Sequence, residues 1–307
     1  MSIKWDEVAR VVVDLVKSNP SWRFPTVRSI FYYLGSPPLE LIPLTKYGYK
    51  KLDEIIVKLR KKGQVPWGYF EVKRGETVPS RTYIDPEQYL YIHIDELKEC
   101  WRYYEVPLWY RQEYVVEVWV EKKGLLPTFE HILMDYDVTI RAAEGYASWE
   151  FVYSAVKEIK DRYFTDRSGQ QVIVLYFGDL DPSGIDIDRH VEEAIKFFDV
   201  DLKFRRLALH PQQIEEWGLP LWPEKMETIA KIMRDPRRKW YFERYGKIAC
   251  ELDSLVAKAY DKLEDLLRSE IEKLLDKSIL RQRNEVNEKH REWLKAKLEN
   301  MRITFEG

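Results

Sequence analysis

The sequence predicts an α/β fold in which helices flank a parallel β-sheet. A smaller, separate module precedes this α/β domain. Two apolar runs rich in β-branched residues, at residues 114–120 and 172–177, have the continuous hydrophobicity of strands buried on both faces. Segments with helical periodicity separate and follow these runs, so strands and helices alternate over residues 113–209. This alternation is typical of a parallel sheet with helical crossovers.

Composition sets the broad class of protein. The 307 residues are 45% hydrophobic and 33% charged, which is enough for two compact domains with their own cores. Cys100 and Cys250 are too few for a disulfide framework or a zinc ribbon, and the five histidines show no metal-binding spacing. No apolar run approaches the roughly 20 residues of a membrane span, and the amino terminus lacks a signal-peptide pattern. We therefore expect a cytoplasmic protein with no membrane partner.

Charge is distributed unevenly along the chain. The net charge is −2, yet residues 1–85 hold 15 Lys and Arg against 9 Asp and Glu, a net charge of +6. The remainder of the chain then carries −8. A basic module attached to an acidic one indicates contact with nucleic acid, although a solvated helix face would give the same excess.

The amino-terminal module, residues 1–85, has the element order of a winged-helix domain, an α+β fold that binds double-stranded DNA. Three helices are expected, at residues 5–17, 27–34 and 45–62. A short strand and turn are expected to follow at residues 65–75. Thr26 stands where it can cap the second helix. Four lysines of the third helix are available to DNA phosphates, namely Lys46, Lys50, Lys51 and Lys58.

A connecting segment of residues 86–112, with a helix at 87–101, leads to the α/β domain of residues 113–260. In that domain the expected strands are residues 114–120, 138–142, 172–177 and 202–209. The expected helices are residues 125–134, a helix that follows 145–148 and ends near 161, residues 184–198, one that starts at His210, and 226–234. From residue 248 the chain is amphipathic and helical, and residues 261–307 form a helical extension.

Acidic residues stand directly after two of the predicted strands. Glu121 follows the first strand, and Asp179 and Asp181 follow the strand at 172–177. The carboxyl ends of parallel strands gather at one edge of a sheet, and residues i and i+2 of an extended chain point the same way. Convergent carboxylates suit a hard cation, so the sequence predicts a Mg²⁺ site made by Glu121, Asp179 and Asp181.

These motifs resemble a known family. Val120-Glu121-Lys122 together with Gly178-Asp179-Leu180-Asp181-Pro182-Ser183-Gly184 is similar to the Toprim domain of the topoisomerase VI A subunit, of the meiotic double-strand-break transesterase, and of uncharacterised Toprim proteins from phages and mobile elements. The resemblance extends to Arg28-Ser29-Ile30-Phe31-Tyr32, to Gly145-Tyr146-Ala147-Ser148 and to Glu251-Leu252-Asp253-Ser254-Leu255. It implies a Toprim-like parallel sheet preceded by a winged-helix domain.

The resemblance also implies a set of site residues. Tyr32 would be the nucleophile, four residues after Arg28 on one helix face. Glu121 and Lys122 join these two in the catalytic group. Further candidates are Tyr33 as a rival nucleophile, Ser148 and Glu251.

The function implied is Mg²⁺-dependent DNA cleavage by tyrosine transesterification, as in the A subunit of a type IIB topoisomerase. Such an enzyme acts as a homodimer in which each tyrosine meets its partner's metal site, and strand passage requires a separate ATPase subunit. Two other functions stay open. The chain could be a Toprim nuclease of a mobile element or defence system that uses activated water, or a non-catalytic DNA-binding or recombination protein with a structural metal site.

Overall fold

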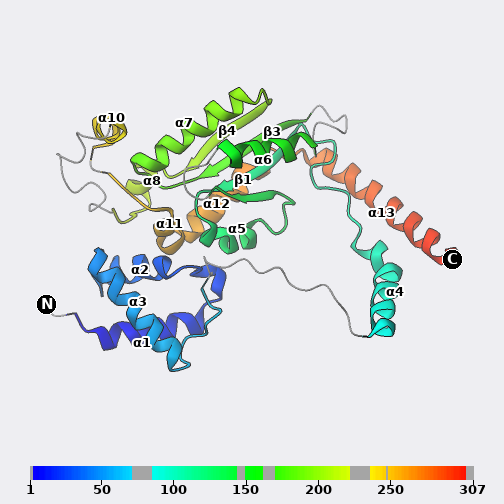
Figure 1. The fold of residues 1–307 in the computed structure, drawn as a ribbon. Helices are drawn as coiled ribbons and strands as arrows, with labels where there is room; N and C mark the ends of the chain where they lie inside the picture. Colours follow the sequence, from blue (N-terminus) through cyan, green and yellow to red (C-terminus); the bar gives the residue numbers. More distant parts are fainter. Residues whose placement is uncertain are drawn as a thin grey trace. The chain divides into compact units, whose positions relative to one another are not determined.

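The computed structural model describes residues 3–70, 85–143, 149–161, 170–221, 236–246 and 248–301. The chain divides into two compact units (Figure 1). The first unit comprises Met1–Lys73 and Glu113–Glu272, and the second comprises Arg74–Gln112 and Lys273–Gly307. Each unit is described below by itself.

The first unit contains a four-stranded parallel sheet with the strand order β2-β1-β3-β4. Its strands are β1 (Tyr114–Val120), β2 (Thr139–Ala142), β3 (Gln171–Phe177) and β4 (Leu202–Ala208). The predicted α/β class, the parallel sheet and all four strands are thereby confirmed. The two longest apolar runs, β1 and β3, are neighbours at the centre, in a register that pairs Val120 with Phe177.

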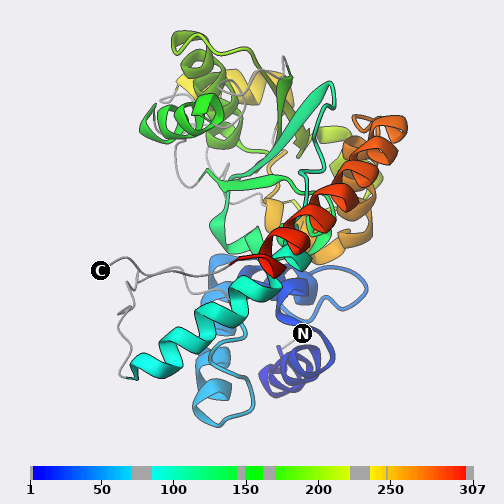
Figure 2. The same ribbon diagram turned by 90° about the vertical axis from the view of Figure 1, so that its right-hand side faces the viewer.

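Helices cover both faces of this sheet (Figures 1 and 2). On one face, α6 (Trp149–Ile159) and α7 (Pro182–Phe197) bury an apolar core against β1 and β3. On the other face, α5 (Leu126–Leu133) follows a 3-10 turn and places Phe129 against Phe177, with ring centroids 5.0 Å apart. The helix α12 (Tyr260–Glu272) packs on α5.

The described part of this unit also contains α8 (Pro211–Glu216), α10 (Pro236–Tyr245) and α11 (Leu252–Lys258). The helix expected from His210 onward is confirmed as α8, with His210 as its N-cap residue. We did not predict α10. The helix expected at residues 226–234 lies outside the described residues.

The amino-terminal part of the first unit consists of α1 (Trp5–Ser18), α2 (Val27–Gly35) and α3 (Lys46–Lys61), with a 3-10 turn at Ser21–Arg23. Thr26 and Thr45 cap α2 and α3, each by accepting a backbone N–H through its hydroxyl. The three helices bury a common apolar core. The three helices expected here are confirmed.

The short strand and turn expected at 65–75 are only partly described, and the described residues 65–70 contain no strand. Residues 65–70 form turns and bends. Pro66 has no N–H to contribute to a strand ladder, and the Tyr69 N–H bonds back to the Pro66 carbonyl at 3.3 Å, which closes a turn. Residues 71–75 lie outside the described residues, so the flap of a winged helix stays a prediction.

The second unit pairs two segments that are far apart in the sequence. Helix α4 (Pro86–Tyr103) contacts α13 (Lys277–Glu299), and the segment after α4 runs along α13. The predicted connecting helix is thus confirmed as α4, and it packs with the carboxyl-terminal helix.

Within the ranges that the structure describes, none of the helices combines the length and the apolar character needed to cross a bilayer.

Candidate functional site at the strand ends

Glu121 and Asp179 are brought together by the pairing of β1 with β3. Because Val120 lies opposite Phe177, the residues that follow the two strands start side by side. The Glu121 carboxylate then accepts a hydrogen bond from the backbone N–H of Asp179, with 2.7 Å between Oε2 and N. The two residues are neighbours at the carboxyl ends of the strands, where the sequence analysis expected them, and their joint role as metal ligands stays a prediction.

Gly178 allows this close approach. A Cβ atom on Gly178 would lie 2.7 Å from the Tyr176 side chain and 2.9 Å from Oε2 of Glu121. Tyr176 itself is fully buried and cannot easily move away. Only glycine therefore fits at this position, between the end of β3 and the Glu121 carboxylate.

Asp181 has a local structural role as well. Its Oδ1 caps α7 by accepting the N–H groups of Ser183 and Gly184 at 2.9 and 2.7 Å. A side chain at Gly184 would place Cβ 2.3 Å from the Asp179 carbonyl oxygen, so the start of α7 packs directly on the loop that carries both aspartates. Asp181 is buried and near enough to Glu121 to affect its pKa.

Lys122 provides the positive charge at the centre of the site. Its Nζ lies 2.8 Å from Asp179, 2.7 Å from Asp253 and 3.5 Å from Glu251. Glu251 and Asp253 belong to the start of α11, and Leu252 between them donates its N–H to Oδ1 of Asp179 at 2.8 Å. Burial alone would lower the pKa of Lys122, but Asp179, Asp253 and Glu251 raise it well above its usual value. We call these six residues, Glu121, Lys122, Asp179, Asp181, Glu251 and Asp253, the strand-end cluster.

The amino-terminal helices are tied to this cluster through α2. Arg28 forms an ion pair with Glu251, and Thr26 donates a hydrogen bond from Oγ1 to Oδ1 of Asp253 at 2.8 Å. The guanidinium of Arg23 donates to the carbonyl oxygens of Val256 and Ala257 at 2.6 and 3.3 Å. Helix α2 therefore lies against α11, with its polar residues directed at the strand-end cluster.

Tyr32 lies in α2 between the apolar core and these charges. Its side chain is fully buried within the core that α1, α2 and α3 share. Burial, and after it the negative charge of Glu251, raise the pKa of the phenol well above its usual value, whereas the positive charge of Arg28 lowers it. The neighbourhood of Arg28 and Tyr32 expected from their spacing is thus present.

Tyr33 is in different surroundings. Its ring packs edge-on against Phe24, with centroids 5.2 Å apart, and Nζ of Lys258 lies 5.4 Å from its centroid. Of the other predicted candidates, Glu251 joins the cluster, and Ser148 lies outside the described residues. Three lysines of α3, Lys46, Lys50 and Lys58, are exposed, and Lys51 pairs with Glu54 at 3.0 Å.

The carboxylates repel one another. Partial burial, and next the charge of Asp179, raise the pKa of Glu121 to about 7, and Lys122 offsets part of this effect. At neutral pH a large share of Glu121 is therefore protonated in the folded protein.

No known protein family, curated protein or solved structure matches this chain. Its candidate site therefore rests on the residues and contacts described above.

The residues at the strand ends fit a hard divalent cation in their donor chemistry, because all their acidic groups offer carboxylate oxygens. The repulsion that raises the pKa of Glu121 is also the kind that a bound cation relieves. In the described part of the chain, however, no three His, Cys, Asp or Glu side chains are arranged to hold a metal ion as they stand. Lys122 supplies the countercharge instead. The magnesium site stays a prediction.

Sequence reasoning did not single out two contributors to the site. Asp253 contacts both Lys122 and Thr26. The only sequence feature that could have indicated it as a site residue was its position two residues after Glu251. Arg206, on β4, donates to the carbonyl oxygens of Gly178 and Gly184 at 3.0 and 2.8 Å and pairs with Asp188. It holds the loop between β3 and α7 in place, and nothing in the pattern around it marks that function.

Proposed function

We propose that this chain cleaves double-stranded DNA by tyrosine transesterification in the presence of Mg²⁺, in the manner of a type IIB topoisomerase A subunit. Under this proposal the parallel sheet is a Toprim-like domain and residues 1–85 are a winged-helix domain. Exposed lysines of α3 would contact DNA phosphates. The active form would be a homodimer, and strand passage would require a separate ATPase subunit.

One observation carries the proposal: α2 presents Arg28 and Tyr32 to the acidic residues of a different part of the chain. Arg28 pairs with Glu251, and Glu251, Asp253 and Asp179 all act electrostatically on the Tyr32 phenol. A tyrosine that only filled the core would need no charged groups near its hydroxyl. A tyrosine that must attack a phosphodiester needs a cation beside it and acid–base groups within reach.

The chemistry assigns a task to each of these residues. Oη of Tyr32 attacks a backbone phosphorus, an O–P bond forms, and the bond from phosphorus to the 3′ oxygen breaks. The phenolic proton passes to a carboxylate, for which Glu251 is the candidate whose charge acts most strongly on the phenol. The 3′ oxygen takes up a proton from solvent, and the DNA remains attached by a 5′-phosphotyrosyl bond. Arg28 stabilises the negative charge that develops on the phosphate.

Glu121, Asp179 and Asp181 would hold the Mg²⁺ ion. When bound, the ion neutralises charge on the scissile phosphate and polarises it toward attack. Lys122, which contacts Asp179 and Asp253 in this structure, would then be available to contact the phosphate through its ammonium group.

Tyr32→Phe tests the proposal. The variant is incubated with end-labelled duplex DNA and Mg²⁺, denatured, and assayed for DNA that migrates with the protein. We expect the wild type to form this adduct and Tyr32→Phe to form none. The substitution removes one hydroxyl, so its cost in stability should be about 1 kcal/mol, and DNA binding should persist.

Two further variants serve as controls. Tyr33→Phe removes a hydroxyl one residue away, from a ring that packs against Phe24, and should keep the adduct. Asp181→Asn keeps an oxygen to cap α7 but removes the negative charge, so it should fold normally and lose cleavage. Loss of the adduct in Tyr33→Phe alone would move the nucleophile by one residue. Absence of any cleavage by the wild type would leave a DNA-binding or recombination protein.

A water-activating Toprim nuclease is the second candidate, and the burial of Tyr32 favours it. The phenol is fully buried and its pKa is raised, so in this conformation it is a poor nucleophile that no DNA strand can reach. Cleavage that persists in Tyr32→Phe, with no protein ever attached to the DNA, would assign the chain to this class.

A further inference from the structure

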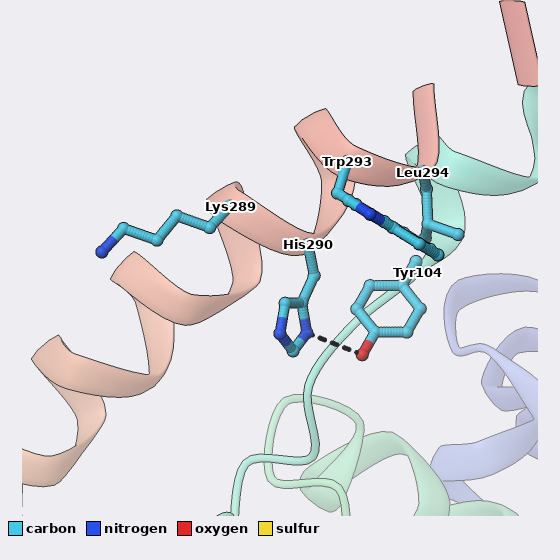
Figure 3. Close-up of a pocket in the computed structure, with 5 residues that line it drawn as sticks. All are labelled: Tyr104, Lys289, His290, Trp293 and Leu294. Atoms are coloured by element: carbon cyan, nitrogen blue, oxygen red, sulfur yellow. Dashed lines mark hydrogen bonds between the residues drawn. The ribbon is translucent and has the colours of Figure 1, made fainter. Parts of the chain in front are cut away.

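The second unit contains an open groove between α13 and the segment that follows α4. Its volume is about 550 Å³, and it is lined by Tyr104, Lys289, His290, Trp293 and Leu294. Figure 3 shows the rings of Trp293, His290 and Tyr104 gathered beneath α13, with the Lys289 side chain extending to one side. All five residues belong to the same compact unit.

Hydrogen bonds join the segment that carries Tyr104 to α13. Oη of Tyr104 and Nδ1 of His290 are 3.0 Å apart, and the Tyr104 carbonyl oxygen accepts a hydrogen bond from Arg291 at 2.8 Å. Two residues on, the N–H of Val106 donates to Asn287 at 2.9 Å. The backbone of the segment is therefore tied to α13, and the groove does not depend on loose side chains for its shape.

The rings of Trp293 and Tyr104 remain exposed, although the backbone that carries Tyr104 is bonded to α13. Trp293 is 60% exposed and Tyr104 is 37% exposed. A tryptophan left open in this way gives up much of the stabilisation that burial would provide. Such exposure is typical of a surface that binds something with a flat apolar face.

Helix α13 carries charges of both signs, and its glutamates and the groove lysines form separate i, i+4 rows. The helix has seven Lys and Arg residues and four Glu residues. All four glutamates recur at spacings of 3, 4 and 7 residues, which places them on one stripe of the helix: Glu285, Glu288, Glu292 and Glu299. Lys289, Trp293 and Lys297, each four residues apart, form another stripe, and Nζ of Lys297 lies 5.6 Å from the centre of the Trp293 ring.

One acidic residue beside the groove, Glu105, is paired with two arginines. Glu105 follows Tyr104, and its carboxylate pairs with Arg283 at 3.2 Å and with Arg291 at 3.1 Å. The groove therefore offers an aromatic surface bordered by Lys289 and Lys297, with the Glu105 carboxylate paired to arginines. An anionic ligand that carries flat rings matches this combination of charge and shape.

We propose that this groove binds single-stranded nucleic acid, with unpaired bases stacked on Trp293 and Tyr104 and phosphates placed against Lys289 and Lys297. Stacking on aromatic side chains combined with a basic track is the general mode of binding to single strands. A duplex keeps its bases stacked inside the helix, so it cannot occupy an aromatic groove in this way. The proposal does not depend on the cleavage activity proposed above.

The test measures binding of the full-length protein to fluorescein-labelled oligo(dT) and oligo(U) by fluorescence anisotropy, in EDTA so that no cleavage occurs. We expect Trp293→Ala to weaken binding about tenfold or more. Trp293→Phe retains a stacking surface and should keep most of the affinity. Replacement of Lys289 and Lys297 by Gln should weaken binding and flatten its salt dependence. A comparison of oligo(dU) with oligo(U), which differ only at the 2′ position, identifies the sugar that the site prefers.

Trp240→Ala is the matched control. Trp240 is an exposed tryptophan of α10, 48% accessible, and Arg244 four residues later lies 5.6 Å from its ring centre. It should leave binding unchanged. Equal loss in both tryptophan variants, or unchanged binding in Trp293→Ala, would overturn the proposal. So would a wild-type dimer that Trp293→Ala converts to a monomer, because a second copy of the chain would then be what covers the groove.

Discussion

At the scale of single residues, Glu121 is the group whose charge state responds most directly to the architecture of the site. In an unfolded chain its carboxyl titrates near 4.5, whereas burial and the nearby Asp179 raise its pKa to about 7 in the folded protein. The folded state therefore holds a proton on Glu121 over a pH range in which the unfolded state has lost it. Folding and the protonation of this residue are linked.

We expect this linkage to appear as a pH-dependent difference between the wild type and Glu121→Gln in EDTA. The contribution of Glu121 to stability is fully present below pH 4.5 and is lost as the pH rises through about 7. The wild type should thus lose stability relative to the variant across this window, by at most about 3 kcal/mol. Urea unfolding of both proteins at several pH values measures the difference. Gln keeps an oxygen for the Asp179 N–H, and parallel pH profiles would contradict the raised pKa.

The residues of the site differ in how far the sequence could predict them. Glu121 and Asp179 stand just after apolar strands, so the parallel arrangement predicted that they lie at the same edge of the sheet, and the pairing of β1 with β3 makes them neighbours. The capping role of Asp181 was hidden, because the same residue type serves as a metal ligand and as a helix cap. Lys122 and Asp253 meet across 131 residues of chain, and no local pattern predicts such a pair.

At the scale of elements, the contact between α2 and α11 decides whether the site exists. Thr26 contributes to it twice, because its hydroxyl caps α2 through the Ser29 N–H and also donates to Asp253. Helix α11 is short and is itself fixed by Asp179, which accepts the N–H of Leu252. Asp179 thus connects the end of β3 to α11, and Thr26 connects α11 to α2.

Thr26→Ala should therefore destabilise the protein more than Thr45→Ala. Thr45 caps α3 in the same way, through the Gly48 N–H at 3.2 Å, and it matches Thr26 in chemistry but forms no hydrogen bond to the described residues of α11. Loss of a cap costs about 1 kcal/mol, and loss of the bond to the buried Asp253 should add about 1 kcal/mol at Thr26. Chemical denaturation measures both variants. Equal losses would mean that the bond to Asp253 contributes nothing.

The elements themselves were largely predictable, with identifiable exceptions. Strong apolar runs and threonine caps placed the strands and the first three helices correctly. The strand expected after α3 does not form at residues 65–70, where the apolar and aromatic residues favoured a strand although Pro66 and Gly68 favour turns. Helix α10 was missed because its sequence is highly charged and has no clear apolar stripe.

At the scale of the whole molecule, the chain leaves its first compact unit after residue 73, returns to it at residue 113 and leaves it again after residue 272. The second unit is built from these two excursions. Their pairing joins residues such as Arg283 and Val106, whose sequence separation of 177 leaves no periodic signal. The sequence analysis therefore predicted residues 86–112 as a connecting segment and residues 261–307 as a separate extension.

Asn287 offers a test of whether the two units unfold independently. It is buried, and its Oδ1 accepts the Val106 N–H at 2.9 Å, so Asn287→Ala leaves a buried donor unsatisfied at a cost of about 1–3 kcal/mol. In hydrogen exchange we expect α4 and α13 to lose protection while β1 and β3 keep theirs, because local opening follows the cooperative units of a structure. Asn284→Ala, an exposed position one turn earlier in α13, should change neither. Loss of protection in β1 and β3 together with α13 would show instead that the chain unfolds as one unit.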